Sequence, residues 1–211
     1  APELAFPYLL LLVSGGHCQL LRVEGVGRYR RLATTIDDAA GEAFDKAGKM
    51  LGLEYPAGPI IDKLAREGKP IFDFPEPQVG ELNFSFSGLK TSILYFLQKE
   101  MAANPNFIKD NLADLCASIQ SSIVKILMKK LTRASTITGI KNIGIAGGVS
   151  ANSGLRSALE SEGKAKKWKT FIPAFEYCTD NAGMIGIAAY YKYLNQDFTD
   201  QHVTPAPRLA F

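Results

Sequence analysis

The feature that most limits the fold is a short apolar run that stops at a pair of glycines. Residues 8–13 read YLLLLV, and the turn SGGH follows at 14–17. A short run that is apolar throughout and ends in glycine is typical of a fully buried strand. Two more strands are predicted at 18–23 and 29–35, because the EGVG between them is typical of a hairpin turn. The sheet is therefore predicted to begin as an antiparallel meander.

Strands and helices alternate later in the chain. Strands are predicted at 142–146 and 168–172, with a helix at about 151–160 between them and another at 179–194 after them. This order predicts a parallel section of sheet with helical cover. The last helix is apolar nearly all round, which predicts that it is buried.

The middle of the chain is predicted to be a mostly helical insertion at about 58–135. Apolar residues recur at steps of three and four from 111 to 134, and shorter helices are predicted at 58–67 and 89–101. Residues 69–88 are rich in Pro and Phe and predict an ordered loop that is packed by its aromatic rings. A further helix is predicted from about residue 37, with Asp37 or Asp38 as its N-cap.

Composition narrows the function classes without choosing one. The chain has 211 residues, 46% hydrophobic and 21% charged, and a net charge of +3. Such a charge permits an acidic partner such as RNA but does not by itself indicate one. Three scattered cysteines without a C-x-x-C pair favour a reducing compartment, and we expect a cytoplasmic protein. The longest apolar run is too short to cross a bilayer, so no membrane partner is expected.

The turn at 14–17 is the first candidate site. Backbone N–H groups of Gly15 and Gly16 can face an anion, because no Cβ stands in the way, and the Ser14 hydroxyl can add a donor. The alternative is a plain hairpin turn between two core strands. His17, one of only two histidines, is interpreted as a support of the turn or part of a cleft wall.

The stretch DDAAGEAFDK at 37–46 is the second candidate. Its carboxylates, Asp38, Glu42 and Asp45, can hold ribose hydroxyls or position a substrate. The alternative is a solvated helix start whose acidic first turn complements the helix dipole.

Two later stretches also combine turns with polar groups. In NIGIAGGVSANSGLR, a strand, two glycines, and then Ser150 and Asn152 at a helix start are typical of phosphate or nucleotide binding; the alternative is a tight turn capped by Ser150. In CTDNAGMIG, Asp180 stands at the start of a helix as either its cap or a metal ligand.

Together these strings resemble one family. LVSGGH, DDAAGEAFDKAGKMLGLEYPAGP, NFSFSGLKT, GGVSAN and CTDNAGMIG are similar in order and spacing to the TsaD family, tRNA threonylcarbamoyladenosine transferases once labelled glycoproteases. The resemblance runs from about Tyr8 to about Leu194. It implies an α/β lobe of the actin-like ATPase (ASKHA, ribonuclease H-like) fold, with a mixed sheet under helical cover. Residues 1–211 would form the C-terminal lobe, and the family's N-terminal lobe is absent from this chain.

The resemblance also implies site residues. By motif, Leu12, Val13, Ser14, Gly15 and Gly16 would contact a bound adenylate, as would Asp45, Gly58, Asp62 and Asn152. Asp180 would be a ligand of one divalent metal ion, iron or zinc. The family's other metal ligands are two histidines in an H-x-x-x-H arrangement upstream of LVSGGH, which this chain lacks. We therefore expect metal binding to be weak or absent here, and this piece to be inactive alone.

The activity that the resemblance implies is a group transfer. The intact enzyme would move the threonylcarbamoyl group from threonylcarbamoyl-adenylate to the exocyclic amine of the adenosine beside the anticodon of a tRNA. Implied partners are the tRNA and helper subunits, including an actin-like paralogue and an ATPase. Two alternatives stay open: a metalloprotease, as the older label holds, and a non-catalytic scaffold paralogue.

Overall fold

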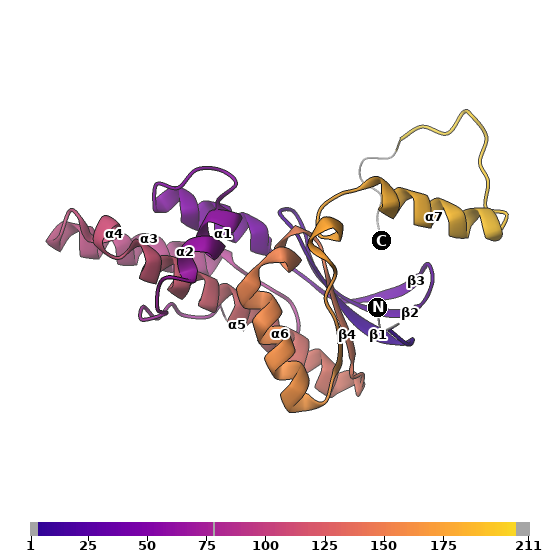
Figure 1. The fold of residues 1–211 in the computed structure, drawn as a ribbon, viewed down its shortest axis with the longest axis horizontal. Helices are drawn as coiled ribbons and strands as arrows, with labels where there is room; N and C mark the ends of the chain where they lie inside the picture. Colours follow the sequence, from indigo (N-terminus) through magenta and orange to yellow (C-terminus); the bar gives the residue numbers. More distant parts are fainter. Residues whose placement is uncertain (1–3, 78, 206–211) are drawn as a thin grey trace. The chain divides into compact units, whose positions relative to one another are not determined.

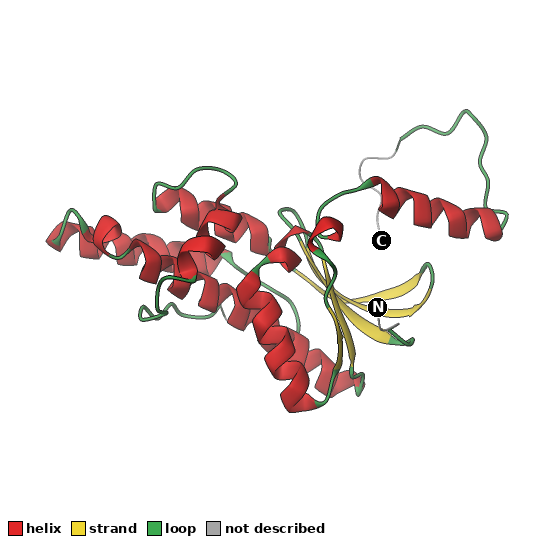
Figure 2. Ribbon diagram, viewed as in Figure 1, coloured by secondary structure: helices red, strands yellow, loops and turns green. Residues whose placement is uncertain are grey.

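The computed structural model describes residues 4–77 and 79–205 and divides at residue 180 into two compact units. Unit 1 covers residues 1–179 and unit 2 covers residues 180–211. Figure 1 shows the course of the chain, and Figure 2 shows that the segment between strands β3 and β4 is built almost wholly from helices and loops. The prediction that residues 1–211 form one lobe stays a prediction.

A five-stranded mixed sheet in the order β3-β2-β1-β4-β5 forms the centre of unit 1. β1 pairs antiparallel with β2 and parallel with β4, so the predicted meander and the predicted parallel section are both confirmed. The strands are β1 (Tyr8–Val13), β2 (Cys18–Gly25), β3 (Arg28–Thr34), β4 (Asn142–Ala146) and β5 (Lys169–Phe171).

Helices cover the face of the sheet that carries Leu9, Leu11 and Val13, all fully buried. The longest helix, α5, supplies much of the core because apolar residues line it at helical spacing, and α2 packs against it. The helices of unit 1 are α1 (Ala40–Met50), α2 (Ala57–Ala65), α3 (Ser87–Ala103), α4 (Phe107–Asp110), α5 (Leu112–Thr138) and α6 (Ser153–Lys166), with short 3-10 turns at Gly148–Ala151 and Phe175–Tyr177.

The Pro- and Phe-rich segment is an ordered loop, as predicted, in the part that the structure describes. Phe72 and Phe74 of the loop pack against Phe96 of α3, with ring centroids 5.2 and 5.5 Å away. Phe107 completes the cluster at 5.8 Å from Phe96. Offset and edge-on aromatic pairs at such distances add to the area they bury, so the rings fix the loop without regular secondary structure.

The predicted N-cap of α1 is wrong, and the caps that stood as alternatives to a ligand role at the last two helices are not found either. Ala39, not Asp37 or Asp38, stands at the N-cap of α1, and its side chain makes no cap bond. α6 is capped by Asn152 rather than Ser150, because the 3-10 turn moves the helix start two residues along. The last helix, α7 (Ala182–Leu194), is capped by Asn181 and not by Asp180.

The predicted burial of the last helix is not found within unit 2. None of the residues Ala182–Leu194 is buried, and large side chains such as Ile185 and Tyr193 are 74% and 65% exposed. An apolar helix is buried only where other elements enclose it. Unit 2 is one helix with a short tail, and so short a segment cannot enclose its own helix.

Candidate functional site

Two glycine turns leave the same edge of the sheet. β1 and β4 run parallel with Leu12 beside Ala146, so the turn at 14–17 and the turn that begins at Gly147 both follow the carboxyl ends of neighbouring strands. In sheets of this kind, ligands bind outside the carboxyl ends of the strands. The two stretches that the sequence singled out separately are therefore adjacent.

Close backbone contacts hold the two turns and the start of α1 together. A Cβ on Gly147 would lie 2.3 Å from the Val13 carbonyl oxygen, and this glycine has a φ of +91°. A Cβ on Gly41 would lie 2.8 Å from the Ser14 carbonyl oxygen, which accepts a hydrogen bond from the Gly41 N–H at 3.1 Å. Only glycine permits both approaches.

Three other glycines at the carboxyl ends of β1 and β4 are open, in the sense that the chain leaves room for a side chain there. A Cβ added to Gly15, Gly16 or Gly148 would meet no atom of the described chain within 4 Å, and none of the three has a positive φ. All three are exposed. Packing within the chain does not require glycine here, so these positions offer bare backbone to a ligand.

Ser14 and His17 close the first turn. The Ser14 N–H donates to the His17 carbonyl oxygen at 2.8 Å, and the His17 N–H donates to Ser14 Oγ at 3.0 Å. The second bond uses a lone pair of the hydroxyl and not its hydrogen. The turn is thus a hairpin turn between β1 and β2, as the alternative interpretation held, and the backbone of its exposed glycines is also accessible to a ligand. His17 supports it through its backbone, as expected.

Leu12 and Val13 are the last two residues of β1. Val13 is fully buried on the helix-covered face, and Leu12 is half-buried on the other. A contact of Val13 with a ligand would therefore be made through the backbone.

A cavity of about 430 Å³ opens beside Gly15 and is lined by charges of both signs. Lys46 donates to Asp38 at 2.7 Å and pairs with Glu42 at 2.8 Å. The hydrogen bond to Asp38, with that to Glu42, raises the pKa of Lys46, and the Lys46 contact lowers the pKa of Glu42. The lining residues are Gly15, Glu42, Asp45, Lys46, Lys49, Leu53, Glu54, Tyr55 and Ala57.

Asp45 and Asp62 each bind the N-terminus of another helix. Asp45 Oδ1 accepts from the Ala57 N–H at the start of α2, at 2.8 Å. Asp62 is buried, and its Oδ1 accepts from the Ser153 N–H at 2.9 Å and from Ser153 Oγ at 2.7 Å, at the start of α6. Its Oδ2 pairs with Arg66 at 2.9 Å. Both carboxylates thus position the helix starts around the turns.

Asn152 is buried, and its side chain is engaged by the chain itself. Its Oδ1 accepts from the Leu155 N–H at 2.9 Å as the cap of α6, and its Nδ2 donates to Gln120 of α5 at 2.7 Å. Gly58 lies in the first turn of α2, where an added Cβ would be 3.9 Å from Phe44. The structure thus connects Asp62 and Asn152 through the start of α6.

Asp37 has a structural role other than the predicted N-cap of α1. It accepts from Ser85 Oγ at 2.6 Å, from the Phe86 N–H at 2.8 Å and from Ser87 Oγ at 2.7 Å. Burial alone would raise the pKa of Asp37, but these hydrogen bonds outweigh it and hold the pKa below its usual value. The sequence feature that corresponds to this role is the string NFSFSGLKT. Its two serines and the backbone of the buried Phe86 donate hydrogen bonds to Asp37, about fifty positions earlier.

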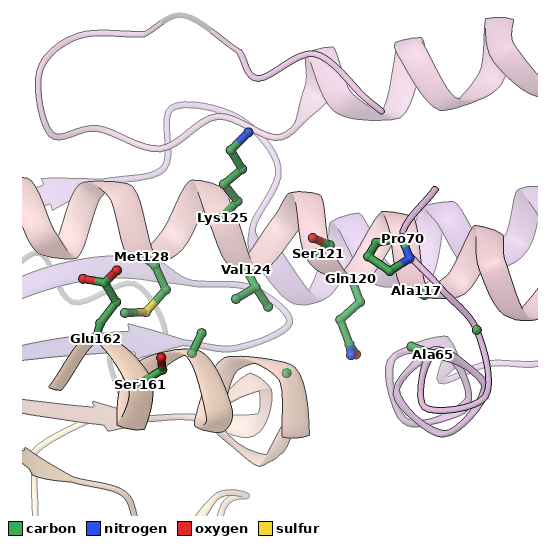
Figure 3. A pocket seen from close by; sticks show the side chains of 13 residues that line it. Ala65, Pro70, Ala117, Gln120, Ser121, Val124, Lys125, Met128, Ser161 and Glu162 are labelled. Atoms are coloured by element: carbon green, nitrogen blue, oxygen red, sulfur yellow. The ribbon is translucent and has the colours of Figure 1, made fainter. Parts of the chain in front are cut away.

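A larger cavity, of about 530 Å³, lies between α5 and α6 (Figure 3). Val124, Met128 and Lys125 come from α5, and Ser161 and Glu162 from α6. Gln120 lines it as well and connects it to Asn152. Apolar side chains and the charged Lys125 and Glu162 line it together, so the lining does not indicate one class of ligand.

Asp180 belongs to unit 2 and is exposed. Among the residues that the structure describes, no group of three His, Cys, Asp or Glu side chains is placed to hold a metal ion. A tight site needs three or four protein ligands. The described residues therefore do not fit a metal centre by themselves, and the metal assignment of Asp180 stays a prediction.

Two of the three free cysteines of unit 1, Cys18 and Cys116, are not placed for nucleophilic chemistry. Cys18 and Cys116 are free and buried; burial raises the pKa of both thiols, that of Cys116 to about 11. A thiol, not a thiolate, is then present at neutral pH, and only the thiolate is a good nucleophile. The described residues of the site suit binding and orientation rather than covalent catalysis.

Comparison with known proteins decides the family. The sequence model of the family described as tRNA N6-adenosine threonylcarbamoyltransferase, TsaD, matches residues 1–187. The chain belongs to the TsaD family. A relative so named from Christiangramia forsetii is 55% identical over 207 residues, which is 98% of this chain and 61% of that protein. The chain spans about 60% of the length of such curated relatives.

Solved structures confirm the fold class. HypF of T. kodakarensis is similar with a TM-score of 0.54 at 20% identity, over 78% of this chain and 21% of that one. Component A of the (R)-2-hydroxyglutaryl-CoA dehydratase of Acidaminococcus fermentans has a TM-score of 0.52 at 18% identity, over 90% and 63%. This TsaD chain therefore has the predicted α/β fold of an actin-like ATPase lobe. No helix among its described residues is long and apolar enough to cross a membrane.

Proposed function

We propose that this TsaD chain is part of an enzyme that transfers the threonylcarbamoyl group from threonylcarbamoyl-adenylate to the exocyclic amine of the adenosine beside the anticodon. The observation that carries the proposal is the meeting of two glycine turns at the carboxyl ends of β1 and β4, with Gly15, Gly16 and Gly148 open. The family membership supplies the reaction.

The open turns suit the adenylate half of the substrate. Backbone N–H groups that face a ligand without a Cβ between them bind phosphate oxygens. In this proposal Ser14, Gly15 and Gly16 contact the phosphate, and Asp45, Gly58, Asp62 and Asn152 shape the adenosine side. The structure supports a change of role for Asp62 and Asn152, because their bonds to the α6 start make them positioning groups.

The nucleophile in this reaction is the amine of the tRNA, so no protein nucleophile is needed. The protein has to bind the two substrates, orient the carbamoyl carbon toward the amine and stabilise the leaving adenylate.

We also propose that Asp180 is one ligand of an iron or zinc ion in the complete protein. That ion would polarise the reacting group as a Lewis acid. We propose a cytoplasmic location, helper subunits that include an actin-like paralogue and an ATPase, and no activity for this chain alone.

The nucleotide site is tested by Gly15→Ala in the complete protein. Because an added Cβ meets no atom of the chain, the variant should fold like the wild type yet hold the adenylate at least about tenfold more weakly, since the methyl group occupies ligand space. Gly80→Ala is the matched control, because Gly80 is equally open in a distant loop. Binding of AMP and transfer to unmodified tRNA are measured. Unchanged binding in Gly15→Ala would contradict the assignment of this turn.

Assays of the complete protein also distinguish the transferase from the two alternative functions, a metalloprotease and a scaffold paralogue. A metalloprotease would use an H-E-x-x-H helix, which this sequence does not contain, and would hydrolyse peptides. A scaffold paralogue would keep tRNA modification going when Asp180 is replaced by Ala. We expect Asp180→Ala to abolish transfer and no peptide hydrolysis to occur.

A further inference from the structure

The β2–β3 hairpin carries an unusual concentration of positive charge. Residues 18–35 hold four arginines and one acid, Glu24, a net charge of +3 that equals the net charge of the whole chain. We call Arg22, Arg28, Arg30 and Arg31 the arginine hairpin. β3 is an edge strand of the sheet, and its first four residues, Arg28–Arg31, are all exposed.

The four cations are not matched by acids of the chain. Of these four arginines, only Arg22 has an ion pair with another residue that the structure describes, namely Glu24 at 3.0 Å. Arg22 stands directly opposite Arg30 in the strand register, and like charges in such cross-strand positions are destabilising. Arg31 projects from the other face, opposite Leu21. The repulsion between Arg22 and Arg30 therefore lowers the stability of the hairpin that carries them.

An ordinary explanation is protection of an exposed strand edge, for which charged side chains are common. That role needs charge of either sign and does not favour arginine. Arginine is the side chain that makes forked hydrogen bonds to phosphate and stacks on bases, and it keeps its charge at all physiological pH values. Charge complementarity thus favours a polyanionic partner with regularly spaced phosphates.

We propose that the arginine hairpin binds the phosphate backbone of the tRNA substrate. This inference rests on the proposed function. In the strand register Arg28 lies beside Gly25, and Arg30 and Arg31 lie beside Arg22 and Leu21. These partners are seven, four and three residues along β2 from Cys18, or about 23, 13 and 10 Å from the glycine turn at about 3.3 Å per residue. The contact is therefore offset along the strand from the glycine turn and acts on the affinity and placement of the tRNA, not on the chemical step.

The test compares Arg30→Glu/Arg31→Glu with the matched control Lys99→Glu/Lys109→Glu, which makes the same charge change at exposed lysines of α3 and α4. Glutamate keeps the strand edge charged, so edge protection is retained. In the 211-residue chain, the hairpin variant should bind an unmodified tRNA transcript at least about tenfold more weakly than the control, with a salt dependence reduced by about two phosphate contacts. Arg30→Lys/Arg31→Lys keeps the charge but loses the forked hydrogen bonds, so its tRNA affinity should lie between those of the wild type and the glutamate variant, with the salt dependence of the wild type.

Several results would overturn the inference. They are equal loss in hairpin and control variants, no measurable tRNA binding by the wild-type chain, or arginine-dependent binding to phosphatidylserine vesicles but not to tRNA. In the complete protein, the hairpin variant should raise the half-saturating tRNA concentration about tenfold and leave turnover at saturating tRNA unchanged. If the wild-type complete protein transfers no threonylcarbamoyl group, the proposed function fails, whereas the tRNA-binding result still decides the role of the hairpin.

Discussion

The two glycine turns at the sheet edge look alike in sequence but are held in different ways. The turn at 14–17 is closed by the hydrogen bonds between Ser14 and His17, and a Cβ added to either of its glycines would meet no atom of the described chain within 4 Å. The turn at 147–148 is wedged against Val13 through Gly147, while Gly148 is open. The difference shows that the glycines of a pair can differ: Gly147 lets two backbone segments pack closely, whereas no contact within the described chain requires glycine at Gly148.

Gly147→Ala should produce the largest loss of stability. The new Cβ would overlap the Val13 carbonyl oxygen, and alanine rarely adopts a φ of +91°, so we expect a loss of about 3 kcal/mol or more in the free energy of unfolding. Denaturant unfolding measures it. Gly148→Ala is the neighbouring control and should change stability by less than about 1 kcal/mol. Equal effects at both positions would show that the two glycines do not differ.

Asp62→Ala should follow, with a loss of about 2–3 kcal/mol, because it leaves the Ser153 N–H and hydroxyl at the α6 start without their acceptor. Asp62→Asn keeps an oxygen for these donors and should lose less than half as much. Thermal unfolding of the two variants separates the two cases. If Asn and Ala are equally damaging, the charge of Asp62 matters more than its acceptor role.

Asp37 gives a smaller effect that depends on pH. Its folded pKa is lowered, so its carboxylate stabilises the fold above its unfolded pKa of about 4, and this contribution is lost as pH falls through the lower folded pKa. The difference in unfolding free energy between wild type and Asp37→Asn should be constant from pH 5 to 7 and shrink below pH 4. A difference that grows toward acid would contradict the hydrogen-bond assignment.

Gly16→Ala should have the smallest effect on stability, within about 1 kcal/mol and toward stabilisation, since alanine lowers the entropy of the unfolded chain and meets no atom in the folded one. AMP binding in the complete protein should nevertheless weaken. A loss of several kcal/mol in stability would mean that the first turn is packed as tightly as the second. That result would remove the main difference between them.

The local elements of this chain are predictable from sequence. β1 and β4 have the bounds predicted for them, and α5 follows from its apolar spacing, because both patterns depend on which residues face the core. The helix starts were predicted less well. Local rules place an N-cap beside its own helix, whereas here Asp37, Asp45 and Asp62 bind the starts of α3, α2 and α6 from elsewhere.

The sequence by itself determined the strands, the long helix and the family, since each depends on residue pattern and order. Tertiary structure alone decided which groups meet: Asp62 finds Ser153 across 91 positions, and Gly41 finds Ser14. It also decided that Gly147 is enclosed and Gly15 open. The physical reason is that a hydrogen bond or a close contact depends on the register of whole elements, and no local stretch of sequence specifies that register.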